Sequence, residues 1–268
     1  MSTNKKSFIE MTTQNSEEND LTISYLTMRK AIGWLGMSLP FILLFGNFFI
    51  NHFDFLNNGW FIKLTQDYKY TAAGSWKSSI SHYYYSTVGE LFTGTLSAVA
   101  LFMFSYNGHS LRKGDFGLAD RTMTFLAGLF AVGVVIFPTS SDTLISDNIR
   151  SFLSSSNTGY IHFTFAALFF ITLAFICIIN FRRAQKIEDF GKGKDDNFFR
   201  ICGIVMLVCI AVIFIYSVFL EQKIKWLDDL QPTFVFETVA LVFFGLSWLT
   251  KGQQMQTTYI LKKIRLIK

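Results

Sequence analysis

Two histidines and two carboxylates in this sequence of 268 residues have the side-chain types that hold a metal ion. They are His82, Asp142, His162 and Glu237, and each lies near the end of a long apolar segment. Nitrogen and oxygen ligands of this kind bind zinc with one position left open for water, which lowers the pKa of that water enough for hydrolysis. No HExxH or HxxxH spacing accompanies them, so a zinc site is an interpretation of residue types alone.

Further polar side chains are expected at the same depth as these four. Glu90, Tyr216 and Glu237 each lie about one helical turn inside an apolar segment. A carboxylate at that depth in a membrane costs on the order of a few kcal/mol unless it is paired, hydrated or protonated. The sequence therefore predicts partners for both glutamates.

Two arrangements would supply these partners. The first is a buried hydrogen-bond network that fixes helix packing. The second is a polar and aromatic cavity, open to the outside, that accommodates a ligand. The candidate ligand-binding residues of such a cavity are His82, Tyr84, Glu90, Thr139, His162, Tyr216 and Glu237.

Helical periodicity predicts which side chains share a face with the two glutamates. Glu90 falls on one face with Thr93, Gly94 and Ser97, and Glu237 falls on one face with Ala240, Phe244 and Ser247. Both faces are predicted to point into the interior of a helix bundle.

The elements that position these residues follow from composition. Hydrophobic residues make up 51% of the chain and charged residues 16%, against a usual charged share of roughly 25% in soluble domains. The apolar residues gather in segments of about 17 to 23 positions, each long enough to cross a hydrocarbon core of ~30 Å as a helix. This predicts an all-α integral membrane protein, a six-helix bundle, with spans at 31–50, 88–106, 123–139, 161–181, 198–220 and 233–250.

The distribution of basic residues predicts the orientation of this bundle. With six spans both termini share a side, and 18 of the 24 Lys and Arg residues fall on that side. Positively charged segments are retained in the cytoplasm, so both termini are predicted to be cytoplasmic. The net charge of +5 is explained by this bias and by anionic lipid headgroups, and does not indicate nucleic-acid binding.

The chain is predicted to hold one folded unit. Residues 1–27 are expected to form a disordered cytoplasmic arm, 28–252 the transmembrane domain and 253–268 a basic cytoplasmic tail. An aromatic outer segment, 51–87, is expected to lie across the outer mouth of the bundle.

Two prolines are predicted to kink helices. Pro40 lies inside the first span and Pro138 near the outer end of the third. Proline lacks an N–H and clashes with the preceding turn, so it kinks a helix and frees carbonyl groups that need other partners.

The runs 79–85 and 89–92, with 137–139 and 162–170, resemble a family of uncharacterised six-span bacterial membrane proteins. These proteins look similar to the Frag/DRAM/Sfk type, whose members are tied to lipid handling and membrane organisation. The resemblance implies six helices with both ends inside, in the bacterial inner membrane. The site is also similar in logic to that of the alkaline ceramidase superfamily, in which histidines and an aspartate hold zinc for lipid amide hydrolysis. This chain lacks that superfamily's paired histidines in the last helix and its seventh span.

These observations predict a membrane protein that binds or handles a lipid or a small amphipathic ligand in an outward-facing cavity. Two alternatives stay open. One is a zinc-dependent hydrolase acting on lipid at the outer leaflet, and the other is an oligomeric pore or membrane-perturbing effector. Membrane lipids are the expected partners in each case, and nucleic acid is not.

Overall fold

Helices make up nearly all of the described part of the chain, which contains no strand. The computed structural model describes residues 26–49, 76–86, 88–108, 110–111, 113–140, 155–183 and 194–267, with side chains from 158 and 197 onward in the last two ranges and up to 253. The first helix is Leu26–Phe49. It is followed by η1 (Ser81–Tyr85), α4 (Gly89–Phe104), α5 (Asp120–Ile136), α6 (Ser155–Phe175), η2 (Ile176–Phe181), α8 (Lys194–Ile215), η3 (Tyr216–Leu220), α9 (Lys225–Asp228) and α10 (Pro232–Ile267).

Several of these helices have the length and composition of membrane spans. Four are long and apolar enough to cross a membrane, and α4 is a shorter apolar helix. With 16 and 17 residues, α4 and α5 are about 24 to 26 Å long, slightly less than a hydrocarbon core. The all-α fold is confirmed, and the chain is a multi-pass membrane protein. The four long candidates are Leu26–Phe49, Thr158–Phe181, Asn197–Leu220 and Lys225–Gln253.

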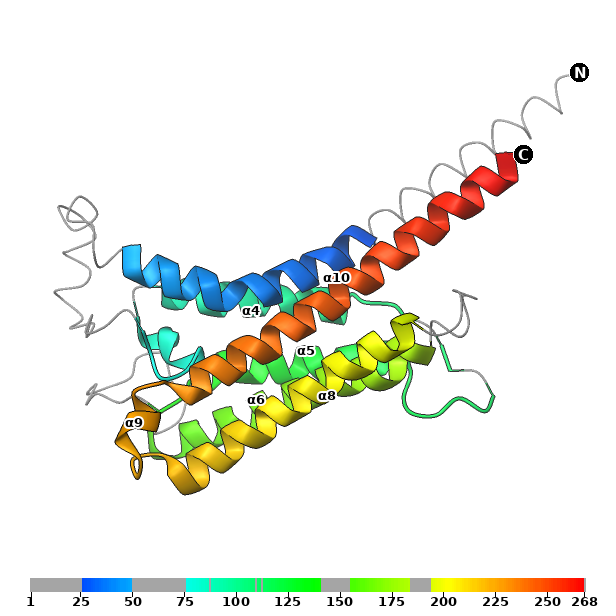
Figure 1. Cartoon of the computed structure of the whole chain (residues 1–268). Coiled ribbons are helices and arrows are strands. Elements are labelled where there is room, and N and C mark those ends of the chain that lie inside the picture. Colours follow the sequence, from blue (N-terminus) through cyan, green and yellow to red (C-terminus); the bar gives the residue numbers. More distant parts are fainter. Residues whose placement is uncertain are drawn as a thin grey trace, which may run out of the picture.

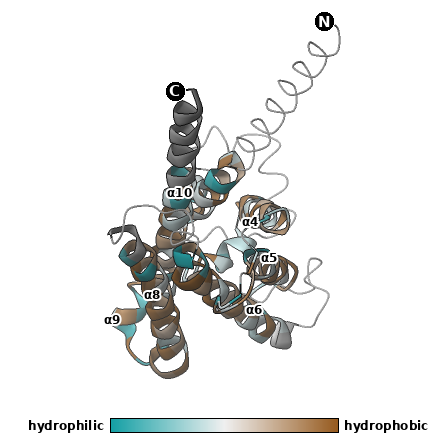
Figure 2. Cartoon of the chain, turned by 90° about the vertical axis from the view of Figure 1, so that its right-hand side faces the viewer, coloured by the Kyte–Doolittle hydropathy of each residue, from teal (hydrophilic) through white to brown (hydrophobic). Residues whose placement is uncertain are grey.

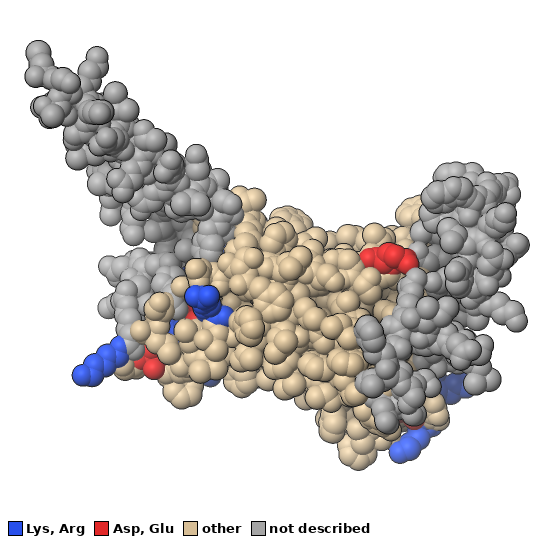
Figure 3. All heavy atoms as spheres, turned by 180° about the vertical axis from the view of Figure 1, so that it is seen from behind, with Lys and Arg blue, Asp and Glu red and all other residues tan. Residues whose placement is uncertain are grey.

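The surface of the bundle is suited to a membrane. Large hydrophobic side chains are exposed along it, and hydrophobic residues dominate α5 and α8 in Figure 2. In Figure 3 the charged side chains visible on one face lie toward the two ends of the described part, with a broad uncharged band between them. A surface of this kind is matched to lipid rather than to water.

The described helices pack against one another in a closed order. Helix α4 packs on α5, α5 on α6, α6 on α8 and α8 on α10. The first helix contacts both α10, through Gly33 and Gly245, and the start of α4, through Gly46 and Val88. Figure 1 shows the first helix and α10 lying along the same side of the bundle. Helix α10 extends beyond the end of the bundle. The chain therefore closes on itself, last helix against first.

The contact between first and last helix depends on glycine. A Cβ added at Gly245 would lie 2.6 Å from the carbonyl oxygen of Gly33, and one at Gly36 would lie 2.4 Å from the Phe244 ring. Small residues let membrane helices approach closely, where van der Waals contact drives their association.

Parts of the predicted organisation fall outside the described residues. These are most of the arm 1–27, residues 51–75 of the outer aromatic segment, and the site residue Asp142. The predicted tail 253–268 continues α10 as helix to Ile267.

Of the two faces predicted to point inward, one is confirmed. On α10, Ala240, Phe244 and Ser247 are fully buried. The prediction for α4 is wrong, because Glu90 and Gly94 are exposed. The buried face of α4 carries Phe92, Leu96, Val99 and Met103 instead, since large apolar side chains with helical spacing fill the core in preference to polar ones.

Candidate functional site

The 3-10 helix η1 and the residues before it connect α10 with α4. The backbone N–H of Phe234 donates to the Ser78 carbonyl oxygen at 3.0 Å. Two residues along, the N–H of Ile80 donates to the Oε2 atom of Glu237 at 2.6 Å. Glu237 thus holds the backbone just before η1 in place. No side-chain pattern could have indicated this partner, because it is a backbone N–H group.

His82 faces back onto the start of the same segment. Its Nδ1 atom lies 2.6 Å from the Ser79 hydroxyl and 3.0 Å from the Ser78 hydroxyl. The Ser79 hydroxyl also accepts the backbone N–H of His82 at 3.2 Å. These short-range bonds stabilise the turn in which Ser81 and Tyr83 are buried.

Pro138 ends α5 and leaves two carbonyl groups for side chains to bond. The helix stops at Ile136, and Phe137 is extended with φ −104° and ψ 96°, as expected before proline. His162 at the start of α6 contacts the Phe137 carbonyl oxygen through Nδ1 at 2.7 Å. The Tyr85 hydroxyl of η1 donates to the Thr139 carbonyl oxygen at 2.7 Å. The kink predicted at Pro138 is not found, because α5 already ends at Ile136.

The protonation of His162 follows from this geometry. A carbonyl oxygen only accepts hydrogen bonds, so Nδ1 carries the proton. The Nε2 atom is buried and has no hydrogen-bond partner among the described residues, and the same holds for the Thr139 hydroxyl. The turn after α5 therefore joins α6 to η1. His162 Nε2 and the Thr139 hydroxyl can still form further hydrogen bonds.

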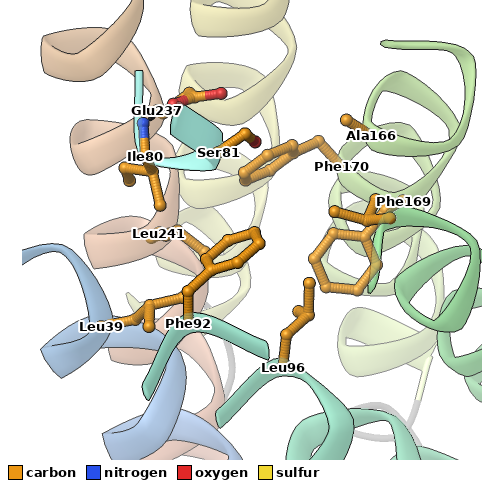
Figure 4. A pocket seen from close by; sticks show the side chains of 11 residues that line it. Leu39, Ile80, Ser81, Phe92, Leu96, Ala166, Phe169, Phe170, Glu237 and Leu241 are labelled. Carbon is orange, nitrogen blue, oxygen red and sulfur yellow. Dashed lines mark hydrogen bonds between the residues drawn. The ribbon is translucent and has the colours of Figure 1, made fainter. Parts of the chain in front are cut away.

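We call the side chains of His82, His162 and Glu237, with the groups they bond, the polar cluster. A cavity lies between the helices next to Glu237 of this cluster. Its volume is about 40 Å³, against the roughly 10 to 15 Å³ that one water molecule needs. Glu237 and Ser81 lie at one end and Leu39, Phe92 and Leu96 at the other, as Figure 4 shows. The remaining described lining residues are apolar: Ile80, Val134, Ala166, Phe169, Phe170 and Leu241.

The other candidate residues lie apart from this cavity lining. Tyr84 is buried beside Tyr85, with ring centroids 5.0 Å apart. Glu90 is exposed on the outside of α4. Tyr216 donates its hydroxyl to Asp228 Oδ1 at 2.6 Å and so ties η3 to α9. Of the seven candidate ligand-binding residues, Glu237 alone lines the cavity.

The described residues contain no group of three His, Cys, Asp or Glu side chains that could hold a metal ion. Of the residues considered for zinc, His82, His162 and Glu237 are described, and each makes the hydrogen bonds given above. Asp142 lies outside the described residues. The arrangement is that of a hydrogen-bonded polar cluster beside an apolar cavity.

A second polar cluster lies at the other end of α5. Asp120 Oδ1 accepts hydrogen bonds from Asn180 and Arg183, both at 2.7 Å. Arg29 donates to the Tyr106 hydroxyl and lies over the Tyr106 ring, 4.8 Å from its centroid. From the sequence, Arg29 and Arg183 contributed only to the prediction of membrane orientation, because each lies just beyond the end of a predicted span.

Comparisons with known proteins give a family for this chain. Neither the curated proteins nor the solved structures include a match. A family model described as "Protein of unknown function (DUF998)" matches residues 59–251, which include η1, the polar cluster around Glu237 and the core of the helix bundle. The chain therefore belongs to the DUF998 family.

Proposed function

We propose that this protein crosses the plasma membrane six times with both termini in the cytoplasm, and that it holds the apolar chain of a lipid or another amphipathic small molecule. Each of the six predicted spans falls on a helix, and the bias of basic residues favours this orientation. In it, the cavity and Glu237 lie toward the outer leaflet.

The observation that carries the proposed function is the lining of the cavity. Apolar side chains from five helices surround it, and the described polar lining is limited to Ser81 and Glu237 at one end. Binding sites for small molecules combine apolar walls with a few placed polar groups in this way. The volume of about 40 Å³ is narrow, so we infer that it takes part of a single chain rather than a whole lipid.

Labelling of single cysteines tests the orientation. Gln222 and Ser110 are exposed in connections at opposite ends of the bundle, and the native cysteines are buried. We expect a membrane-impermeant maleimide to label Gln222→Cys in intact cells and Ser110→Cys only after permeabilisation. The opposite pattern, or labelling of both from one side, would overturn the six-span topology.

Photocrosslinking tests chain binding. The full-length protein in vesicles would be irradiated with a phosphatidylcholine that carries a diazirine at the end of one acyl chain, and the modified residues mapped by mass spectrometry. We expect label on Phe92, Leu96 or Phe169 in the wild type. Ala166→Leu adds bulk to the cavity wall and should abolish this label, whereas Ala211→Leu, at an exposed position of α8, should not.

The outcome that contradicts chain binding is equally specific. Label confined to exposed residues such as Leu101 and Phe214, with the same yield in Ala166→Leu, would show contact with bulk lipid only.

A further inference from the structure

We infer that the ligand of this cavity carries a protonated amine, which the Glu237 carboxylate binds while the apolar chain of the ligand lies among the aromatic rings. This inference rests on the proposed function and names the class of headgroup. It is argued from the charge, the hydrogen bonding and the shape of the cavity.

The charge of the lining is the first argument. Glu237 is acidic, and the other described lining residues are apolar apart from the Ser81 hydroxyl. None of these described residues carries a positive charge. A carboxyl group in apolar surroundings keeps its charge when an opposite charge lies beside it and otherwise takes up a proton. In either state it repels or gains nothing from an anion, so the cavity favours a cation over an anion.

The hydrogen bonding of Glu237 is the second argument. Its Oε2 atom accepts the Ile80 N–H at 2.6 Å, which fixes the carboxylate in place. An ionised carboxylate has about four acceptor positions, so one backbone donor leaves most of them for a ligand. An ammonium group has up to three donors and matches that capacity.

The two histidines of the polar cluster do not supply a positive charge to the Glu237 carboxylate. The Nδ1 atom of His82 is directed at the Ser78 and Ser79 hydroxyls, and that of His162 at the Phe137 carbonyl oxygen. Neither histidine belongs to the cavity lining.

The shape of the cavity is the third argument. Figure 4 shows the Phe170 ring near Ser81 and Glu237, with Phe92 and Leu96 further from the carboxylate. Ring faces attract cations within ~6 Å of the ring centroid, and apolar side chains suit an alkyl tail. The polar end of the cavity, with the Phe170 ring beside it, therefore suits an ammonium group, and the apolar end suits the alkyl chain of an alkylamine.

Three probes of equal chain length test the inference: dodecylamine, dodecanol and dodecanoate. Each would be titrated into the full-length protein in lipid nanodiscs at neutral pH. Thermal unfolding would be followed with a thiol-reactive dye, because Cys177, Cys202 and Cys209 are buried until the protein unfolds. We expect dodecylamine to raise the unfolding temperature at lower concentrations than either other probe.

The matched variant is Glu237→Gln. Its amide oxygen can still accept the Ile80 N–H, but the negative charge is lost. A charge-assisted hydrogen bond contributes about 1.5 to 3 kcal/mol, so the apparent affinity for dodecylamine should fall about tenfold to a hundredfold. Binding of dodecanol should change much less.

A second variant keeps the test decisive if Glu237→Gln does not fold. Phe170→Leu removes the ring near the carboxylate and keeps the site apolar. It should weaken dodecylamine binding severalfold while leaving dodecanol binding nearly unchanged. Equal loss for both probes would contradict the inference.

The outcomes separate this inference from the proposed function. If all three probes stabilise the wild type equally, or dodecanol and dodecanoate do so more strongly than the amine, chain binding stands and the amine is overturned. If none of them stabilises the wild type and acyl-chain photolabelling also fails, the proposed function is overturned together with the inference.

Discussion

Arg183 and Asp120 form a buried ion pair, with Nη2 of the guanidinium 2.7 Å from Oδ1 of the carboxylate. Asp120 lies in the first turn of α5, and Arg183 follows η2. The same guanidinium donates to the carbonyl oxygens of Phe116 and Leu118, so it fixes the segment that leads into α5. This pair joins two elements that are 63 residues apart in the chain.

We expect Asp120→Asn to destabilise the protein by about 3 to 5 kcal/mol, because it leaves the buried Arg183 charge without its carboxylate. Asp229→Asn, at an exposed position before α10, should change stability by less than about 0.5 kcal/mol. Unfolding in detergent, followed by dye labelling of the buried cysteines, measures both. Combining Asp120→Asn with Arg183→Met should cost less than the sum of the single changes, and strict additivity would show that the pair does not contribute as described.

The crossing of the first helix and α10 gives a second expectation. In Gly245→Ala the new Cβ would lie 2.6 Å from the Gly33 carbonyl oxygen, and overpacking of this kind costs about 1 to 3 kcal/mol. Gly94→Ala on α4 is the matched control, since its Cβ meets no atom within 4 Å. It should stabilise the helix by up to about 1 kcal/mol. Equal unfolding temperatures for the two variants would contradict the close crossing.

The third expectation concerns pH. Burial raises the pKa of the Tyr83 hydroxyl to about 12, although a backbone hydrogen bond with Lys77 lowers it in part. A tyrosine in the unfolded chain loses its proton near pH ~10. Between about pH 10 and 12 the unfolded state therefore binds fewer protons than the folded state, and stability falls by up to about 1.4 kcal/mol per pH unit.

Below pH ~10 both states keep this proton, and the contribution of Tyr83 to stability is fully present. Tyr83→Phe should unfold with a shallower dependence on alkaline pH than the wild type, whereas Tyr160→Phe, at an exposed position, should follow the wild type. Parallel stability curves for the wild type and Tyr83→Phe would rule out this contribution.

The helices could be predicted from the sequence because long apolar segments have few alternatives to helix in a membrane. The positions of Glu237 and His162 in the first part of α10 and α6 followed from their distance to the ends of those segments. Their partners did not, because the Ile80 N–H and the Phe137 carbonyl are backbone groups that every residue carries. Pro138 was a local signal for an interrupted helix, but it could not say that α5 ends at Ile136 or which side chains bond the carbonyls that follow.

The direction in which polar side chains point was harder to predict. Helical periodicity groups Glu90 with Gly94 but does not say whether that face meets the core or the lipid, and Phe92 and Leu96 decide this by packing. Tyr216 meets Asp228 because η3 and the turn into α9 bring them together, a geometry with no counterpart in spacing. Arg183 counted only as one basic residue in the topology argument and Asp120 was not singled out, since ion pairing across 63 residues leaves no local pattern.

The closure of the first helix on α10 bears on how the protein is made. The cavity takes Leu39 from the helix Leu26–Phe49 and Glu237 and Leu241 from α10, so helices far apart in the sequence share its wall. Helices enter a membrane in order of synthesis and associate afterwards. A nascent chain that has inserted every helix except α10 has neither the acidic end of the cavity nor the surface against which Gly33 packs. The cavity therefore forms only after α10 has been inserted, and a chain that stops before α10 lacks its acidic end.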